Sequence, residues 1–147
     1  MYPLEITKVA AALGGTRTLG AELRTLGDLA EAVERGLPRA VVRALASSAA
    51  PDRDAELRRR IAALVASPAT LKRSVRLSPA ASERAERLAR VAALARQALG
   101  DEDEAKAWLT ESHPLFGERP PIEVAATDLG ARQVERVLLN IEHGLPV

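Results

Sequence analysis

The sequence of 147 residues contains no cysteine, and its aromatic residues are limited to one tryptophan, one tyrosine and one phenylalanine. The absence of cysteine excludes disulfides, thiolate metal sites and a cysteine nucleophile, and it agrees with a reducing compartment. No apolar run approaches the roughly 20 residues that a membrane-spanning helix needs. The segment Met1–Leu13 carries Glu5 and Lys8 and has no basic start typical of a secretion signal. We therefore expect a soluble, cytoplasmic protein without membrane contact.

The residues that are abundant favour helices. Apolar residues make up 47% of the chain but aromatic residues only 2%, so alanine, leucine and valine must supply most of any core. Alanine and leucine are strong helix formers, and the low content of aromatic and β-branched residues argues against a large sheet. The composition therefore predicts an all-α fold.

Apolar residues also recur with helical spacing along almost the whole chain, and strand-like alternation is nearly absent. The longest expected helix begins at Ser78–Pro79, a serine cap before a first-turn proline, and ends at Gly100. A similar start at Ser67–Pro68 predicts a short helix that carries Leu71 and Val75. The other expected helices run from about Leu4 to Leu13, Leu26 to Arg35, Pro38 to Ser47, Arg53 to Val65, Asp101 to Leu109 and Thr127 to Ile141.

Charge is distributed unevenly, although the net charge is only +1. Residues 57–99 contain ten basic and two acidic residues, whereas residues 100–147 contain four basic and ten acidic residues. A basic middle followed by an acidic end indicates two different partners, one of them polyanionic. The alternative is that these charges only cover solvated helix faces.

The basic middle has the proportions of a helix-turn-helix. The helix ending near Val65 and the short helix after Ser67 are separated by a tight turn. In such motifs the second helix enters the major groove and neighbouring basic groups bind phosphates. Many helical hairpins share these proportions, so the pattern alone is weak. The DNA-contacting residues that it predicts are Ser67, Thr70, Lys72, Arg73 and Arg76.

Signals for an enzyme are poor. His113 and His143 are far apart in sequence and have no metal-ligand spacing, and Gly14–Gly15 lacks the context of a phosphate-binding loop. The acidic run Asp101–Glu104 stands at an expected helix start, where carboxylates compensate the helix dipole. We therefore expect no catalytic residues, no metal and no cofactor.

The last third of the chain is more specific. The run Ala105–Gly117, followed by Arg119–Val124, resembles the A-x-x-W-L…P-x-L-x-G…P-x-E/D motif of the toxin-binding domain of Xre, ParS and MbcA antitoxins. The closing residues Thr127–Ala131 and Ile141–Gly144 resemble the T-D-x-G-A and I-E-x-G elements of the same domain. Upstream, Thr70–Arg73 is similar to the T-L-x-R-R stretch of the family's Xre-type helix-turn-helix.

This resemblance implies two regions: residues 1–76, helical, with the helix-turn-helix at about 53–76, and residues 77–147, a small helical toxin-binding domain. It implies an antitoxin of a type II toxin–antitoxin system that neutralises a RES-domain toxin, an NAD-consuming or ADP-ribosylating protein, by covering its active site. It also implies a homodimer within a larger complex that represses its own operon by binding operator DNA. Two alternatives stay open, a stand-alone transcriptional regulator and a helical adaptor that does not bind DNA.

The predicted toxin contacts come from two places. The first is the tryptophan-containing helix with the loop after it, and the second is the end of the final helix with the apolar tail beyond Gly144. A glycine at this position is expected to take a left-handed conformation, and Pro146 to stiffen the tail. The predicted toxin-binding residues are Trp108, Leu115, Phe116, Asn140, Glu142, His143, Gly144, Leu145, Pro146 and Val147.

Overall fold

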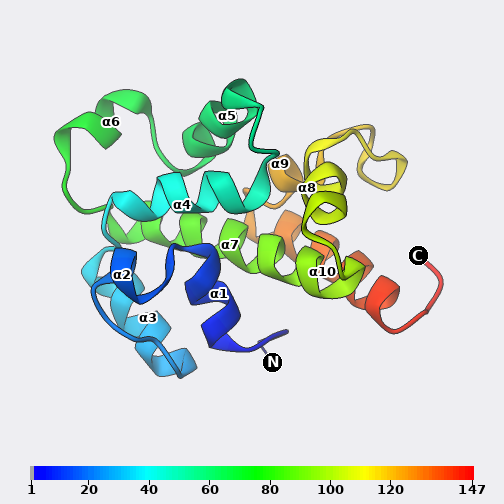
Figure 1. Cartoon of the computed structure of the whole chain (residues 1–147), viewed down its shortest axis with the longest axis horizontal. Helices are drawn as coiled ribbons and strands as arrows, with labels where there is room; N and C mark the ends of the chain where they lie inside the picture. Colours follow the sequence, from blue (N-terminus) through cyan, green and yellow to red (C-terminus); the bar gives the residue numbers. More distant parts are fainter. Residues whose placement is uncertain (1) are drawn as a thin grey trace.

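The computed structural model describes residues 2–147, and within them the fold is all-α, as the sequence predicts (Figure 1). These residues form ten α-helices and one 3-10 helix, without a β-strand. None of the helices within the same residues is long and apolar enough to cross a membrane. The elements are α1 (Ile6–Ala12), α2 (Gly15–Leu19), α3 (Leu26–Arg35), α4 (Ala40–Ala49), α5 (Ala55–Val65), α6 (Pro68–Arg73), α7 (Pro79–Leu99), α8 (Glu102–Thr110), η1 (Pro114–Phe116), α9 (Pro121–Val124) and α10 (Asp128–Glu142).

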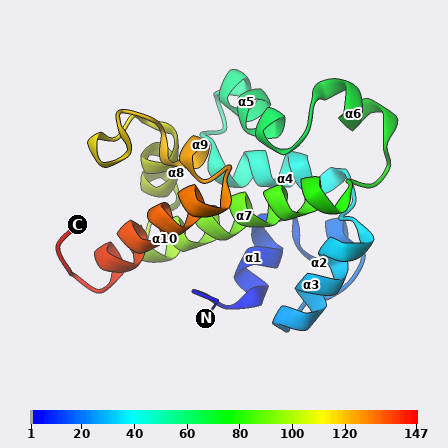
Figure 2. The same cartoon turned by 180° about the vertical axis from the view of Figure 1, so that it is seen from behind.

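Helix α7 is the centre of the fold. Its start follows the prediction, because the Ser78 hydroxyl accepts a hydrogen bond from the backbone N–H of Ala81 at 3.1 Å and Pro79 occupies the first turn. Gly100 ends the helix in a left-handed conformation, with φ of 75°. Helices α1, α3 and α4 pack against α7 from the N-terminal half, and α8 and α10 pack against it from the C-terminal half (Figures 1 and 2).

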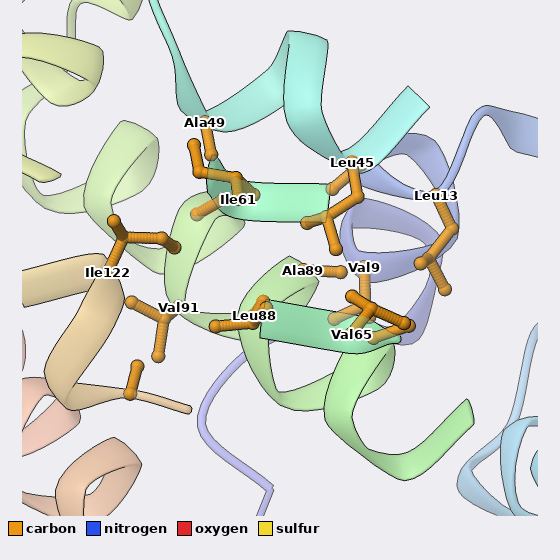
Figure 3. Close-up of a cluster of buried hydrophobic side chains, with 14 of the residues drawn as sticks. Val9, Leu13, Leu45, Ala49, Ile61, Val65, Leu88, Ala89, Val91 and Ile122 are labelled. Carbon is orange, nitrogen blue, oxygen red and sulfur yellow. The ribbon is translucent and has the colours of Figure 1, made fainter. Parts of the chain in front are cut away.

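The hydrophobic core follows α7 and is built mainly from aliphatic side chains (Figure 3). Alanines at buried positions of α7 let neighbouring helices approach closely, so a core forms with few aromatic rings. The cluster contains residues from both regions expected from the sequence, 1–76 and 77–147. The two regions therefore share one hydrophobic core. Labelled members in the close-up are Val9, Leu13, Leu45, Ala49, Ile61, Val65, Leu88, Ala89, Val91 and Ile122.

One short helix was not predicted, and one prediction about a short element is wrong. The first helix ends before Gly14–Gly15 as predicted, but a left-handed Gly14 then redirects the chain into α2, which was missed. Val75 does not belong to α6, which ends at Arg73. Instead Val75 lies in an extended segment whose carbonyl accepts a hydrogen bond from the backbone N–H of Arg39 at 2.9 Å, and its side chain is 79% exposed.

Close approach of α10 to α9 depends on Gly130. A Cβ atom at this position would overlap the carbonyl oxygen of Val124. The Thr127 hydroxyl caps α10 by accepting a hydrogen bond from the backbone N–H of Gly130 at 3.1 Å. The glycine and the cap together fix the direction in which α10 runs along α7 towards the C-terminus.

Candidate functional site

An aromatic cluster lies where α8 meets the following loop. Trp108 packs edge to face against Phe116, with 6.2 Å between ring centroids, and against His113, with 5.6 Å. The ring centroids of His113 and Phe116 are 5.4 Å apart. Phe116 is only 9% exposed. The cluster therefore gives this loop a small core of its own, in which Phe116 packs inward.

The loop is closed by backbone hydrogen bonds. The N–H of His113 donates to the carbonyl of Arg119 at 3.3 Å, and Gly117 and Glu118 both take left-handed conformations with φ of 63°. The side chain of His113 accepts a hydrogen bond through Nδ1 from the backbone N–H of Leu115 at 3.2 Å. Leu115 itself is 49% exposed. Of the residues predicted here for toxin contact, Leu115 faces solvent and Phe116 supports it.

The end of α10 holds the remaining predicted residues. Gly144 has φ of 67°, the left-handed conformation expected from the sequence. The backbone N–H of Leu145 donates to the carbonyl of Asn140 at 2.7 Å, and the Asn140 side chain donates to the carbonyl of Pro146 at 3.3 Å. Exposed fractions of 55% for Leu145 and 64% for Val147 show that this anchored tail offers apolar side chains to solvent.

Glu142 and His143 differ in their surroundings. The Glu142 carboxylate accepts a hydrogen bond from the Gln97 side chain at 2.7 Å, which ties the end of α10 to α7. His143 is the exposed C-cap residue of α10. It is therefore separate in environment from His113, which belongs to the aromatic cluster. Within residues 2–147 no group of three or more histidine, aspartate or glutamate side chains could hold a metal ion.

The residues predicted for DNA contact lie on and beside α6. The Ser67 hydroxyl accepts a hydrogen bond from the backbone N–H of Thr70 at 3.2 Å and donates to its hydroxyl at 2.9 Å, so both side chains take part in the cap. Arg76 donates to the carbonyl of Gly36 at 2.8 Å. Lys72 and Arg73 are exposed. These two cations are the members of the predicted set that are most available to a phosphate.

Helix α6 stands at the edge of the molecule, at the opposite end from the tail and the η1 loop (Figures 1 and 2). It has no buried residue. The Arg39 guanidinium donates to the carbonyl of Leu71 at 2.9 Å and so binds the C-terminal end of this helix. The two predicted surfaces are therefore far apart along the molecule. Arg39 was not predicted from the sequence, because its partner lies 32 residues further along the chain.

A partly buried ionic network connects the N-terminus to α7 and α10. The Arg90 guanidinium is 3.1 Å from Glu86 and 2.5 Å from Glu135, and the hydroxyl of Tyr2 donates to Glu86 at 2.7 Å. Burial raises the pKa of the Glu86 carboxyl, although Arg90 acts in the opposite direction. Burial and then Glu86 raise the pKa of Tyr2. This network holds the helices in place and lies outside both predicted surfaces.

Lys106 links the two halves of the chain in a similar way. Its side chain is only 7% exposed, and Nζ is 3.2 Å from Glu102 and 3.4 Å from Asp52, which lies in the α4–α5 connection. Nearby, Arg60 of α5 forms an ion pair with Glu123 of α9 at 2.6 Å. These contacts join the elements around α5 to those around α8.

Comparison with known protein families assigns the C-terminal region. Residues 94–144 match the family model described as the antitoxin Xre/MbcA/ParS C-terminal toxin-binding domain. A search of curated proteins finds no match to the chain. The matched residues include α8, the η1 loop, α9 and α10, which are the elements that present Leu115 and the anchored tail. Over residues 94–144 the chain is therefore similar to the toxin-binding domain of the Xre/MbcA/ParS antitoxins, and this similarity supports an antitoxin role in a toxin–antitoxin system.

Proposed function

We propose that this protein neutralises a RES-domain toxin, which consumes NAD or uses it for ADP-ribosylation, by covering the toxin's active site with the end of α10 and the tail that follows. The observation that carries the proposal is the anchored apolar tail. Leu145 and Val147 are exposed. Asn140 holds the tail through two hydrogen bonds, one from the backbone N–H of Leu145 and one to the carbonyl of Pro146. A tail that is already ordered loses little conformational entropy when it binds.

The charge of the C-terminal region agrees with such a target. Residues 100–147 contain ten acidic and four basic residues. A pocket that binds the phosphates of NAD is expected to be positively charged, so this region would be steered towards it. Glu142 and His143 lie directly before the tail, and Leu115 would extend the contact from the η1 loop. Trp108 and Phe116 would act by holding that loop.

The second part of the proposal concerns DNA. The helices α5 and α6 would act as the helix-turn-helix through which a homodimer represses its own operon, in the cytoplasm. Lys72 and Arg73 would contact phosphates, because both are exposed cations on α6. Neutralisation would need no catalysis by this chain and no cofactor.

The test uses the toxin encoded beside this gene. The purified pair is examined by pull-down, and NAD turnover by the toxin is measured with increasing amounts of this protein. We expect a stable complex and loss of turnover. A chain that binds operator DNA but neither binds nor inhibits the toxin would contradict the proposal in favour of a stand-alone regulator. Toxin inhibition without operator binding would contradict the DNA part and favour a helical adaptor.

A further inference from the structure

A basic groove lies between α4 and α5, next to the C-terminal end of α6. Its volume is about 790 Å³, and it is open to solvent. Arg39, the N-cap residue of α4, and Arg43 of α4 line one wall. Arg58 and Arg59 of α5 line the other, and Asp52 is the acidic residue among the lining residues. Arg58 and Arg59 belong to the basic middle of the sequence, but none of the four arginines was predicted to contact DNA, because the groove forms only where α4 and α5 meet.

The four arginines divide into two pairs. Arg39 donates to a backbone carbonyl at the C-terminal end of α6. Arg58 donates to the backbone carbonyl of Pro51 at 3.3 Å and to that of Asp52. Arg43 and Arg59 make no hydrogen bond or ion pair with residues 2–147, so their guanidinium groups have unused donors. The carboxylate of Asp52 is 3.4 Å from Lys106, which leaves the groove with an excess of positive charge.

We infer that this groove binds the sugar–phosphate backbone of duplex DNA through Arg43 and Arg59. The inference rests on the proposed DNA-binding role and adds a phosphate-binding surface to it. Arg39 and Arg43 are one helical turn apart, about 6 Å along α4. The sugar–phosphate backbone of one DNA strand would therefore pass between guanidinium groups on the two walls of the groove. Guanidinium groups bind phosphate well because their donors form a planar fork. Lys72 and Arg73 of α6 would continue the contact.

An acidic peptide would be the other candidate for a basic groove. Peptide docking usually adds affinity by burying apolar side chains in the groove. Here Val42 and Ala46 in the floor are each only 4% exposed, so they offer little apolar surface for such burial. Four arginines against one aspartate, over a floor in which Val42 and Ala46 are buried, favour a polyanionic backbone.

The experiment measures binding of the full chain to a fluorescent, mixed-sequence duplex of about 20 bp, two helical turns. Anisotropy is recorded at several salt concentrations between about 50 and 200 mM. Arg43→Ala/Arg59→Ala is compared with the matched pair Arg132→Ala/Arg136→Ala, which removes the same charge from exposed positions of α10. We expect the slope of log K against log salt to fall by about 2 in the groove variant, since each phosphate contact contributes about 0.9. The α10 variant should keep the wild-type slope.

Equal slopes for the wild type and the groove variant would overturn the inference. In that case the variant Lys72→Ala/Arg73→Ala tests the proposed DNA-binding role separately. A lower slope in this variant would support DNA binding by α6 and would contradict only the role of the groove. A wild-type chain that binds no duplex even at the lowest salt concentration would remove both. Binding of poly-glutamate that disappears in the groove variant, without a change in the DNA slope, would reassign the groove to an acidic peptide. Thermal melts of both variants check the fold.

Discussion

Trp108 and Phe116 pack edge to face, with their ring planes inclined at 86°, and so attach the η1 loop to α8. This contact assigns different roles to two neighbouring residues. Leu115 is half exposed, whereas Phe116 is nearly buried against the indole. The loop therefore presents one side chain and uses the next one as its support.

Phe116→Ala is expected to lower the free energy of unfolding by about 3 kcal/mol, because it removes a buried ring. Leu115→Ala should change it by less than about 0.5 kcal/mol, because the side chain is exposed, and should still weaken toxin binding. Urea unfolding and a toxin-binding titration separate the two effects. A stability loss in Leu115→Ala as large as in Phe116→Ala would contradict this division.

Deletion of Leu145–Val147 should leave the thermal melt almost unchanged, because two of the three side chains extend into solvent. Neutralisation should weaken strongly, since burial of two aliphatic side chains contributes roughly 3–6 kcal/mol by area, less ordering costs. Growth rescue of toxin-expressing cells measures this. Full rescue by the truncated chain would move the toxin contact away from the tail, towards the η1 loop.

Two glycine substitutions differ in what they should do. Gly130→Ala is expected to destabilise the fold by about 3 kcal/mol, because the new methyl group overlaps the carbonyl of Val124. Gly144→Ala meets open space and only strains a left-handed residue, at about 1 kcal/mol. Thermal melts of both variants test this order, and a reversed order would show that α10 can shift away from α9 at little cost.

The raised pKa of Glu86 gives a pH-dependent prediction. The folded state binds the proton on the Glu86 carboxyl more strongly than the unfolded chain does. The favourable contribution of this protonation to the free energy of unfolding is therefore complete below the ordinary pKa of 4.5 and is lost as pH rises through the pKa of the folded state. Glu86→Gln stays neutral at every pH and can still accept a hydrogen bond from Tyr2. Its stability relative to wild type should therefore increase as pH rises above about 4.5.

Urea unfolding at several pH values measures this difference. Glu83→Gln is the matched control, because it removes the same charge from an exposed position on the same helix. A difference for Glu86→Gln that stays flat or decreases as pH rises would show that the Arg90 ion pair outweighs burial.

The partners of Lys106 should compensate for one another. Asp52→Ala or Glu102→Ala alone leaves the ammonium with the other carboxylate, so each variant should lose less than about 1 kcal/mol. The double variant leaves a buried cation without a partner and should lose about 3 kcal/mol, more than the two single losses added together. Adding Lys106→Met should restore most of that loss, because the methionine keeps the apolar stem and removes the charge. Urea unfolding of the series tests this, and strictly additive losses would contradict it.

Local signals in the sequence were sufficient for most of the fold. The caps at Ser67 and Ser78 act through hydrogen bonds to the residue three positions further along, so the short patterns that predicted them contain all of the participating atoms. Helix α2 was missed because its glycines and threonines favour turns as much as helices. Val75 was placed on a helix because it stands four residues after Leu71. Pairing of the extended Arg76 with Pro38, a distant segment, overrides that spacing.

The candidate surfaces were predicted only in part. Leu145 and Val147 could be selected because apolar residues beyond a helix-ending glycine have no evident core to join. The inward packing of Phe116 could not be predicted, because it depends on how the loop folds back onto Trp108. The same reason applies to Arg43 and Arg59, which meet across a groove that exists only after α4 and α5 have packed.

The sharing of α7 by both halves of the core has a consequence for the turnover of this protein. A protease that cut between α6 and α7 would remove the apolar side chains of α1, α4 and α5 that cover one face of α7. The C-terminal fragment would then expose that face to water and would unfold or aggregate. Degradation from the N-terminal side is therefore expected to abolish the proposed toxin binding together with the proposed DNA binding.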